Sequence, residues 1–200
     1  MSNTRCFVAI ELPDEIRSRM HETCEAVISA APQWRGEKWV AEQNLHLTLK
    51  FLGSLGDEDL VHVREALAAA VVDGPPFLMD VASLAAVPRP SRCSMVWARL
   101  SDPEGGCADV AARVEAAAVS CGLPAEQRAF SPHITLARAR RPHPLLPEAL
   151  TCGDAVLTCT LLSMSVPSVT LFSSTLTRTG PVYETIDSWT LSGPRPDVKK

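Results

Sequence analysis

Along the first hundred residues, segments with the apolar spacing of a strand alternate with segments that have the apolar spacing of a helix. Compact or every-second apolar residues predict strands, whereas apolar residues three or four positions apart predict helices. The first helix opens after Pro13, and the second opens at an N-cap Asp57 and ends at Gly74 and Pro75. The expected strands are 5–12, 38–40, 45–53, 77–87 and 94–100, and the apolar helix positions are Ile16, Met20, Val27 and Ile28, then Leu60, Val63, Leu67 and Val71.

The second half of the chain repeats this rhythm. A helix carries Val110, Val114 and Ala117 and ends at Gly122, and a strand follows that contains HITLAR. The Pro-rich stretch RRPHPLLPEAL is expected to be a connection. Helices and antiparallel strands in two similar halves predict the α+β class. The last expected strands are 156–166, 168–176 and 181–191, with one domain over 1–192 and a flexible tail over 193–200.

Composition narrows the class of protein. The chain has 200 residues, of which 46% are hydrophobic and 21% charged, as in an ordinary globular protein. The formal net charge of -4 argues against a broad nucleic-acid-coating surface but leaves room for a local basic pocket. No apolar run is long enough to span a bilayer, and the first residues lack the pattern of a signal peptide. We therefore expect no membrane partner.

The number and spacing of the cysteines indicate the redox conditions in which the protein works. There are seven, an odd number, and no two stand at C-x-x-C spacing. This usage predicts a reducing cytoplasm, with neither a disulfide framework nor a zinc site.

One short word occurs twice, in NLHLTLKFLG (44–53) and in FSPHITLARAR (130–140). Side chains alternate faces along a strand, so His46 and Thr48 point the same way while Leu47 points into the packed layer behind. His133 and Thr135 repeat the arrangement. Each word therefore presents an imidazole and a hydroxyl side by side on a hydrophobic anchor.

Two such words facing one cleft suit a phosphodiester. A neutral imidazole takes a proton from water, and a protonated imidazole gives one to the leaving oxygen. The threonine hydroxyls hold the non-bridging phosphate oxygens as their charge grows. The residues themselves leave open which histidine is the acid and which is the base.

Other readings of the histidines have less support. A single strand histidine is often only a hydrogen-bonded structural residue, although a matched pair is harder to explain that way. A catalytic zinc takes three protein ligands, and no Asp, Glu or Cys stands beside either word at ligand-like spacing. A G-x-S-x-G nucleophile motif is absent. His21, His62 and His143 have no companion threonine, so we expect them to be surface or structural residues.

With these words the chain resembles the 2H phosphoesterase superfamily, and most of all the RNA 2′,3′-cyclic phosphodiesterases, also called 2′–5′ RNA ligases or LigT-like proteins. The resemblance runs from about Arg5 to Leu191 through RCFVAIELP, KWVAEQNLHLTLKFLG, MVWARL, FSPHITLAR and LFSSTLTRTGPVYETI. Arg99 stands where a small residue is common, and Ser173 where a longer polar or basic residue is common. The stretch 140–150 has no clear counterpart.

The resemblance implies a fold and a reaction. The fold is two pseudo-symmetric lobes, each an antiparallel sheet with helices on its outer face, flanking a central active-site groove. The reaction is metal-free and cofactor-free cleavage of a terminal 2′,3′-cyclic phosphate to a 2′-phosphate. His46 would donate a proton and His133 accept one, with Thr48 and Thr135 on the phosphate; in the reverse 2′–5′ ligation the histidines exchange roles. Partners would be RNA 3′ ends or nucleotide cyclic phosphates, and we expect a monomer without an obligate protein partner.

Basic and aromatic residues near the words are further candidates. Arg138 stands five positions after His133, an odd offset that needs a bulge to reach the same face, and it would bind phosphate. We expect Arg140 and Arg141 to be solvated charges. Remaining basic candidates are Lys50 and Arg128. The candidate base-stacking rings are Phe7, Phe51 and Phe130, of which Phe7 and Phe51 are more typical of core positions.

Two other functions compete with RNA-end hydrolysis. The first is a non-catalytic nucleotide-binding module on the same scaffold. The second is a small-molecule cyclic phosphodiesterase. The second histidine favours an enzyme, because binding alone does not need a proton donor and acceptor pair.

Overall fold

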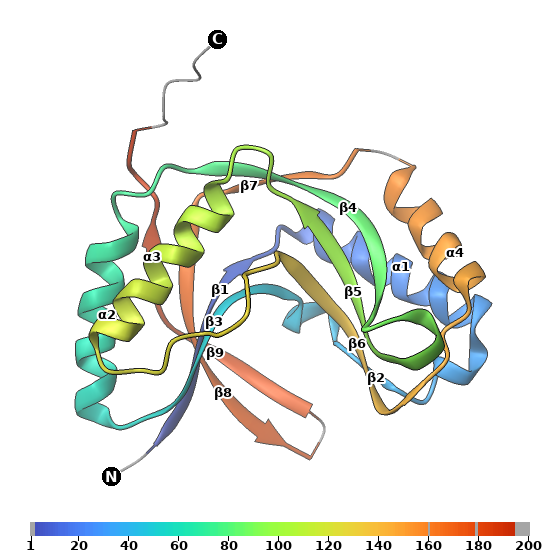
Figure 1. The fold of residues 1–200 in the computed structure, drawn as a ribbon, viewed down its shortest axis with the longest axis horizontal. Coiled ribbons are helices and arrows are strands. Elements are labelled where there is room, and N and C mark those ends of the chain that lie inside the picture. The colour runs from blue at the N-terminus through green and yellow to red at the C-terminus, as the bar shows by residue number, and fades with distance from the viewer. Residues whose placement is uncertain (1–2, 160, 179, 195–200) are drawn as a thin grey trace.

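A computed structural model describes residues 3–159, 161–178 and 180–194, and Figure 1 shows their arrangement. Within them one antiparallel sheet has the strand order β7-β4-β5-β6-β3-β1-β8-β9, with β2 paired to β6. The α+β class is therefore confirmed. The strands are β1 (Thr4–Glu11), β2 (Lys38–Trp39), β3 (His46–Leu55), β4 (Phe77–Val87), β5 (Cys93–Ser101), β6 (His133–His143), β7 (Ser163–Val166), β8 (Ser168–Thr177) and β9 (Gly180–Thr190), and the α-helices are α1 (Asp14–Ala30), α2 (Asp57–Val71), α3 (Gly106–Ser120) and α4 (Pro147–Thr158).

The sheet divides into two lobes that meet where β3 pairs with β6. The first lobe contains β3, β1, β8 and β9, and the second contains β6, β5, β4 and β7. Helices α2 and α3 pack together on the first lobe, while α1 and α4 pack together on the second (Figure 1). The predicted pair of lobes, each with helices on one face, is thus confirmed, although hydrogen bonds join the two sheets into one.

The lobes are interleaved along the chain. The order β1-α1-β3-α2-β4 is followed by β5-α3-β6-α4 and then by β7 and β8. After α2, strand β4 crosses to pair with β5, and β8 later returns to pair with β1. Neither lobe is therefore a continuous segment of the chain.

The end of the described chain is attached to the first lobe. The backbone N–H groups of Ser192 and Gly193 donate to the carbonyls of Val72 and Gly74 at 3.0 Å each. Of the flexible tail expected over 193–200, residues 195–200 lie outside the described residues.

The helices bury the residues that the apolar pattern predicted. Helix α1 buries Ile16, Met20 and Val27 against the second lobe, and Ile28 is only half-buried. Buried positions on the other lobe are Val63, Leu67 and Val71 of α2 and Val110, Val114 and Ala117 of α3. One contiguous hydrophobic core links both helix pairs with the sheet.

The region between β6 and β7 differs from the prediction. The stretch 140–150 is not a connection, because β6 continues to His143 and α4 begins at Pro147; most of 156–166 is not a strand either. Packing explains the helix. A Cβ on Gly153 would lie 2.3 Å from Leu84 Cδ1 and 2.8 Å from Val27 Cγ2, so only glycine allows this approach. Asp154 Oδ1 also accepts the Leu84 N–H at 2.6 Å.

The start of α2 is shifted by one residue from the prediction. Gly56, not Asp57, is the N-cap, and no side-chain hydrogen bond caps the helix. Asp57, Glu58 and Asp59 fill the first turn, where carboxylates interact favourably with the positive end of the helix dipole. Acidic charge therefore takes the place of the expected cap.

The cysteines and the lengths of the helices bear on two further expectations, a chain without a disulfide framework and one without a membrane-spanning segment. Cys6, Cys24, Cys93 and Cys107 are buried as free thiols. None of the helices in the described ranges combines the length and the apolar character that crossing a membrane requires.

Candidate active site

The two H-x-T words meet at their central residues. Leu47 and Ile134 are antiparallel Cα partners, and both side chains are fully buried. Because side chains alternate, the flanking histidines and threonines lie on the opposite face, which we call the open face. There His46, Thr48, His133 and Thr135 are all half-buried. The structure thus brings together all four residues that the repeated word singled out.

Each histidine is held by the same backbone contact. His46 Nδ1 lies 2.7 Å from the carbonyl oxygen of Asn44, and His133 Nδ1 lies 2.7 Å from that of Ser131. A carbonyl oxygen only accepts, so Nδ1 carries the hydrogen in both rings. The neutral form of each imidazole therefore keeps its lone pair on Nε2, which is the atom left to exchange a proton.

The surroundings of the two rings differ. His133 lies flat against Trp97, with ring centroids 3.7 Å apart and an angle of 22° between the planes. His46 has a tilted contact to Phe7 at 4.9 Å and an edge contact to Tyr183 at 5.4 Å. Its Nε2 lies 3.0 Å from Thr48 Oγ1. The lobes are thus similar in backbone but not in the aromatic residues around the histidines.

Both imidazoles have lowered pKa values. Burial is the main cause of the lowered pKa of His46, which the Asn44 carbonyl partly offsets and the charges of Arg138 and His133 lower further. Burial likewise lowers the pKa of His133, with the Ser131 carbonyl opposing and the Arg138 charge adding to the effect. The free site therefore favours two neutral imidazoles.

Arg138 reaches the open face because β6 contains a bulge. Trp97 pairs with Thr135 and Val96 pairs with Ala137, so Leu136 is the extra residue. The alternation shifts by one, and the guanidinium comes round to the side of the histidines. Its charge acts on the pKa of His46, of His133 and of Tyr183, whose pKa burial raises. The odd offset is thus compatible with a phosphate-binding position.

The first lobe has the matching bulge, with a different result. Ala9 pairs with Thr48 and Val8 with Lys50, so Leu49 is the extra residue. Lys50 consequently turns toward the helices and is buried. Phe51 faces the open side and is 59% exposed, which corrects the expectation that it is a core residue. Lys50 is therefore not placed to bind a substrate phosphate.

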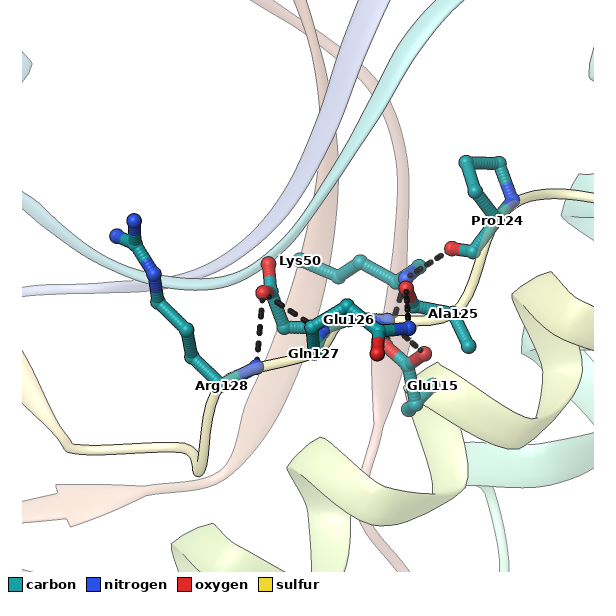
Figure 2. Close-up of polar contacts among 7 residues, drawn as sticks. All are labelled: Lys50, Glu115, Pro124, Ala125, Glu126, Gln127 and Arg128. Carbon is teal, nitrogen blue, oxygen red and sulfur yellow. Dashed lines mark hydrogen bonds and ion pairs between the residues drawn. The ribbon is translucent and has the colours of Figure 1, made fainter.

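Lys50 instead holds the loop that leads into the second word (Figure 2). Its Nζ donates to Glu115 Oε2 at 2.6 Å and to the Pro124 carbonyl at 3.1 Å. Glu115 Oε1 accepts the Glu126 N–H at 2.8 Å, and Glu126 in turn accepts the N–H groups of Gln127 and Arg128. The Arg128 side chain is exposed and points away from this cluster.

The aromatic candidates have different accessibility. Phe7 is only 2% exposed, since its ring contacts His46, Phe51, Phe172 and Tyr183. It supports the imidazole from within, and this burial fits a core aromatic better than a stacking platform, although Phe7 also lines the cavity beside His46. Phe130 is 37% exposed, in the loop before His133.

A cavity of about 310 Å³ lies beside His46, on the side of the first lobe. Its walls are partly aromatic and partly polar. A hydrogen bond of 2.9 Å from Asn44 Nδ2 to the Pro181 carbonyl joins two of its walls. The residues that line it include Phe7, Glu11, Arg17, His46, Phe172 and Tyr183.

Sequence reasoning missed Trp97, Phe172 and Tyr183. Trp97 and Tyr183 contact the histidines, and Phe172 stacks on Phe7. All three lie in MVWARL and LFSSTLTRTGPVYETI, which resemble the family but did not single out these residues. The remaining histidines agree with the expectation of surface or structural roles: His21 and His62 are exposed, and His143 stacks on Trp34 and pairs with Glu37. Arg140 and Arg141 are exposed. The described residues contain no group of three or more His, Cys, Asp or Glu that could hold a metal ion.

Known proteins are similar to this chain in sequence and in fold. The profile of the family described as LigT like Phosphoesterase matches residues 10–97 and 101–183. An RNA 2′,3′-cyclic phosphodiesterase of Aeropyrum pernix is 34% identical over 74% of this chain and 83% of its own length. One of Geobacillus stearothermophilus is 29% identical over 96% of this chain, but the match spans 59% of that protein.

Solved structures agree with these relatives. The protein TT0787 of Thermus thermophilus has a TM-score of 0.76 at 28% identity, and the match covers 94% of this chain and 98% of that one. E. coli LigT complexed with 3′-AMP has a TM-score of 0.73 at 25% identity, with 96% and 99% covered.

Proposed function

The chain belongs to the LigT-like phosphoesterase family, and on that premise we propose that it hydrolyses the terminal 2′,3′-cyclic phosphate of RNA to a 2′-phosphate. The observation that carries this proposal is the convergence of His46 and His133 on one open face, through the buried pair Leu47–Ile134. Two imidazoles with the same Nδ1 anchor provide a proton acceptor and a proton donor for one phosphodiester.

The proposed step moves one proton at each histidine. His133 Nε2 takes a proton from water while the water oxygen bonds to phosphorus. The bond from phosphorus to O3′ breaks, and His46 gives its Nε2 proton to that oxygen. The assignment of donor and acceptor follows the family resemblance. In 2′–5′ ligation, which this proposal includes, a 5′ hydroxyl of RNA takes the place of water: His133 accepts the hydroxyl proton and His46 again protonates O3′. The histidines therefore keep their roles, which corrects the expectation that they exchange them.

Three side chains are proposed to hold the phosphate. The hydroxyls of Thr48 and Thr135 lie beside the histidines, and Arg138 reaches the same face through the Leu136 bulge. Hydrogen bonds from these groups to the non-bridging oxygens become stronger as charge accumulates there. Their placement supports binding of a single phosphate between the two words.

The negative charge of the substrate would favour the protonated form of His46, which the proposed step requires. In the free site the pKa of His46 is lowered, mainly by burial, so the ring is mostly neutral near neutral pH. A bound phosphate anion favours the imidazolium and raises that pKa. The substrate charge thus favours protonation of the histidine that acts as the acid, and the assignment of that role to His46 follows the family resemblance.

The cavity beside His46 is proposed to take the nucleoside. His46 protonates O3′, so the ribose that carries this oxygen must lie on the His46 side. The cavity of about 310 Å³ opens there and has the aromatic walls that suit a sugar and base. Water, or the hydroxyl in ligation, then approaches from the His133 side. RNA 3′ ends are therefore the expected partners.

The test uses an oligonucleotide that ends in a 2′,3′-cyclic phosphate, incubated with the purified chain in EDTA. We expect a 2′-phosphate product at the same rate with and without the chelator. Tight nucleotide binding without turnover would favour the binding module. Faster turnover of small cyclic phosphate esters than of RNA would favour the small-molecule enzyme, and a rate restored only by added metal would contradict the metal-free step.

A further inference from the structure

We propose that Trp97 is a positioning residue for His133, with an indole that both orients the imidazole and stabilises its protonated form. This inference rests on the proposed function, in which His133 becomes an imidazolium as it takes a proton from water. An indole face attracts a cation stacked on it, and tryptophan does so more strongly than phenylalanine.

The geometry of the stack fixes the ring of His133 in a second direction. The centroid separation of 3.7 Å and the 22° angle place the indole over the face of the imidazole. The Ser131 carbonyl holds the edge at Nδ1 at 2.7 Å. The hydrogen bond to Ser131 sets the rotation of the imidazole within its own plane, and the stack on Trp97 sets the orientation of that plane. Together they direct Nε2.

The charges around His133 make the indole contact important. Arg99 is its direct Cα partner on β5, and Arg138 lies on its own strand. His46, on β3, interacts with it across the open face. Among these, the charge of Arg138 lowers the pKa of His133, and His133 and His46 oppose each other's protonation. The Ser131 carbonyl favours the imidazolium. The Trp97 face, stacked on the ring, is the group that the inference adds to it.

The stack also distinguishes the two lobes. Trp97 pairs with Thr135, and the residue that pairs with Thr48 in the first lobe is Ala9. An alanine provides no aromatic face, and the ring contacts of His46 are tilted or edge-on. The histidine that gains a proton during hydrolysis is thus the one with the flat aromatic partner, as expected if Trp97 serves the base.

Trp97 does not serve as a hydrogen-bond donor within the described protein. Trp34 Nε1 donates to the Pro144 carbonyl at 3.0 Å, and Trp39 Nε1 donates to the Trp34 carbonyl at 2.8 Å. Trp97 Nε1 is buried and has no such partner in the described ranges. Its substitution by an apolar residue therefore breaks no protein hydrogen bond, which makes the site suitable for a clean series of variants.

The experiment compares wild type with Trp97→Phe and Trp97→Leu. Both replacements keep an apolar cover on His133, while the attraction for a cation decreases from Trp to Phe to Leu. NMR titration of the imidazole without substrate should show the proton affinity of His133 decreasing in that order, by about 3- to 10-fold for leucine. The value of kcat should decrease in the same order with little change in KM, and its acidic limb should move to lower pH. Trp189→Phe, on β9, is the control and should change neither quantity.

The titration of His133 tests the role of Trp97, and turnover of a cyclic phosphate tests the proposed function, so the two can fail independently. An unchanged or raised pKa of His133 in Trp97→Phe would overturn it, even if RNA is still hydrolysed. A lowered pKa without turnover of any cyclic phosphate, in wild type or variant, would support the stack and reject the proposed function. If Trp97→Leu fails to fold, the titration of Trp97→Phe decides.

Discussion

Arg138 lies on the same face of β6 as His133, although five positions separate them and a regular strand would turn them apart. The bulge at Leu136 is the cause, and the matching bulge at Leu49 brings Phe51 to the same place in the first lobe. The open face is therefore asymmetric, with a cation beside one word and an exposed ring beside the other. This asymmetry gives the first prediction.

Replacing Arg138 by methionine should affect both binding and titration. The guanidinium charge lowers the pKa of His46 and of His133, after burial, so its removal should raise both values and move the pH–rate profile to higher pH. Loss of a charged hydrogen-bond donor should raise KM by about 10-fold or more. Steady-state kinetics across pH measures both effects. Arg141→Met, at an exposed position, should behave as wild type, and an unmoved profile in Arg138→Met would contradict the placement.

Removing either imidazole should abolish most of the turnover. We expect His46→Ala and His133→Ala each to lower kcat by about 10²–10⁴, the usual contribution of a general acid or base. The double variant should be far less impaired than the product of the two, because the residues act as a unit. Rates on a cyclic-phosphate oligonucleotide check this, with exposed His62→Ala as the control. Near-native turnover in either single variant would reject the assignment.

The threonines should matter less than the histidines. Thr48→Val and Thr135→Val keep the side-chain shape and remove the hydroxyl, and we expect each to lower kcat/KM by about 10-fold. Thr48→Ser should recover most of the activity, because it retains the hydroxyl that lies 3.0 Å from His46 Nε2. The same kinetic assay decides, and a serine variant as impaired as the valine variant would argue against the hydroxyl.

Breaking the Lys50–Glu115 pair should destabilise the protein. Lys50 is buried, and its replacement by methionine leaves Glu115 without its cation and the Pro124 carbonyl without a donor. We expect a loss of about 1–3 kcal/mol in the free energy of unfolding. Arg113→Met removes the largely exposed pair with Asp109 and a long hydrogen bond, 3.4 Å, to the Ala70 carbonyl, and should cost less, about 0.5 kcal/mol. Urea denaturation of the two variants gives the comparison, and equal losses would mean that burial of Lys50 adds nothing.

The two histidines should make stability depend on pH. Their pKa values are lower in the folded chain than the ordinary value near 6.5, mainly through burial, so the unfolded chain binds protons first. The contribution of the neutral rings is complete above about pH 6.5 and is lost as the pH falls from there through the folded values. His46→Gln should flatten this slope in unfolding curves measured between pH 5 and 8 (roughly the range where a histidine titrates). A slope identical to wild type would mean that the ring is not desolvated.

The amino-acid pattern predicted the strands and the repeated word better than the elements that depend on packing. Helix α4 was missed because Gly153 and several β-branched or small residues argue against a helix locally. The contact with Val27 and Leu84, which favours it, lies far away in the chain. The bulges at Leu49 and Leu136 are a matter of strand register, which no local residue type announces. Trp97 reached His133 through the pairing of β5 with β6, so the word itself carried no sign of it.

The pairing of β8 with β1 sets the order in which the protein is completed during synthesis. β1 is translated before the other described strands, yet one of its two neighbours, β8, is the second-to-last of them. Until that neighbour emerges, the edge of β1 stays open to other chains, which is a known risk for aggregation. Ribosome-bound chains that stop before Pro167 should therefore need chaperones and should show no turnover, even though both histidines have already been translated.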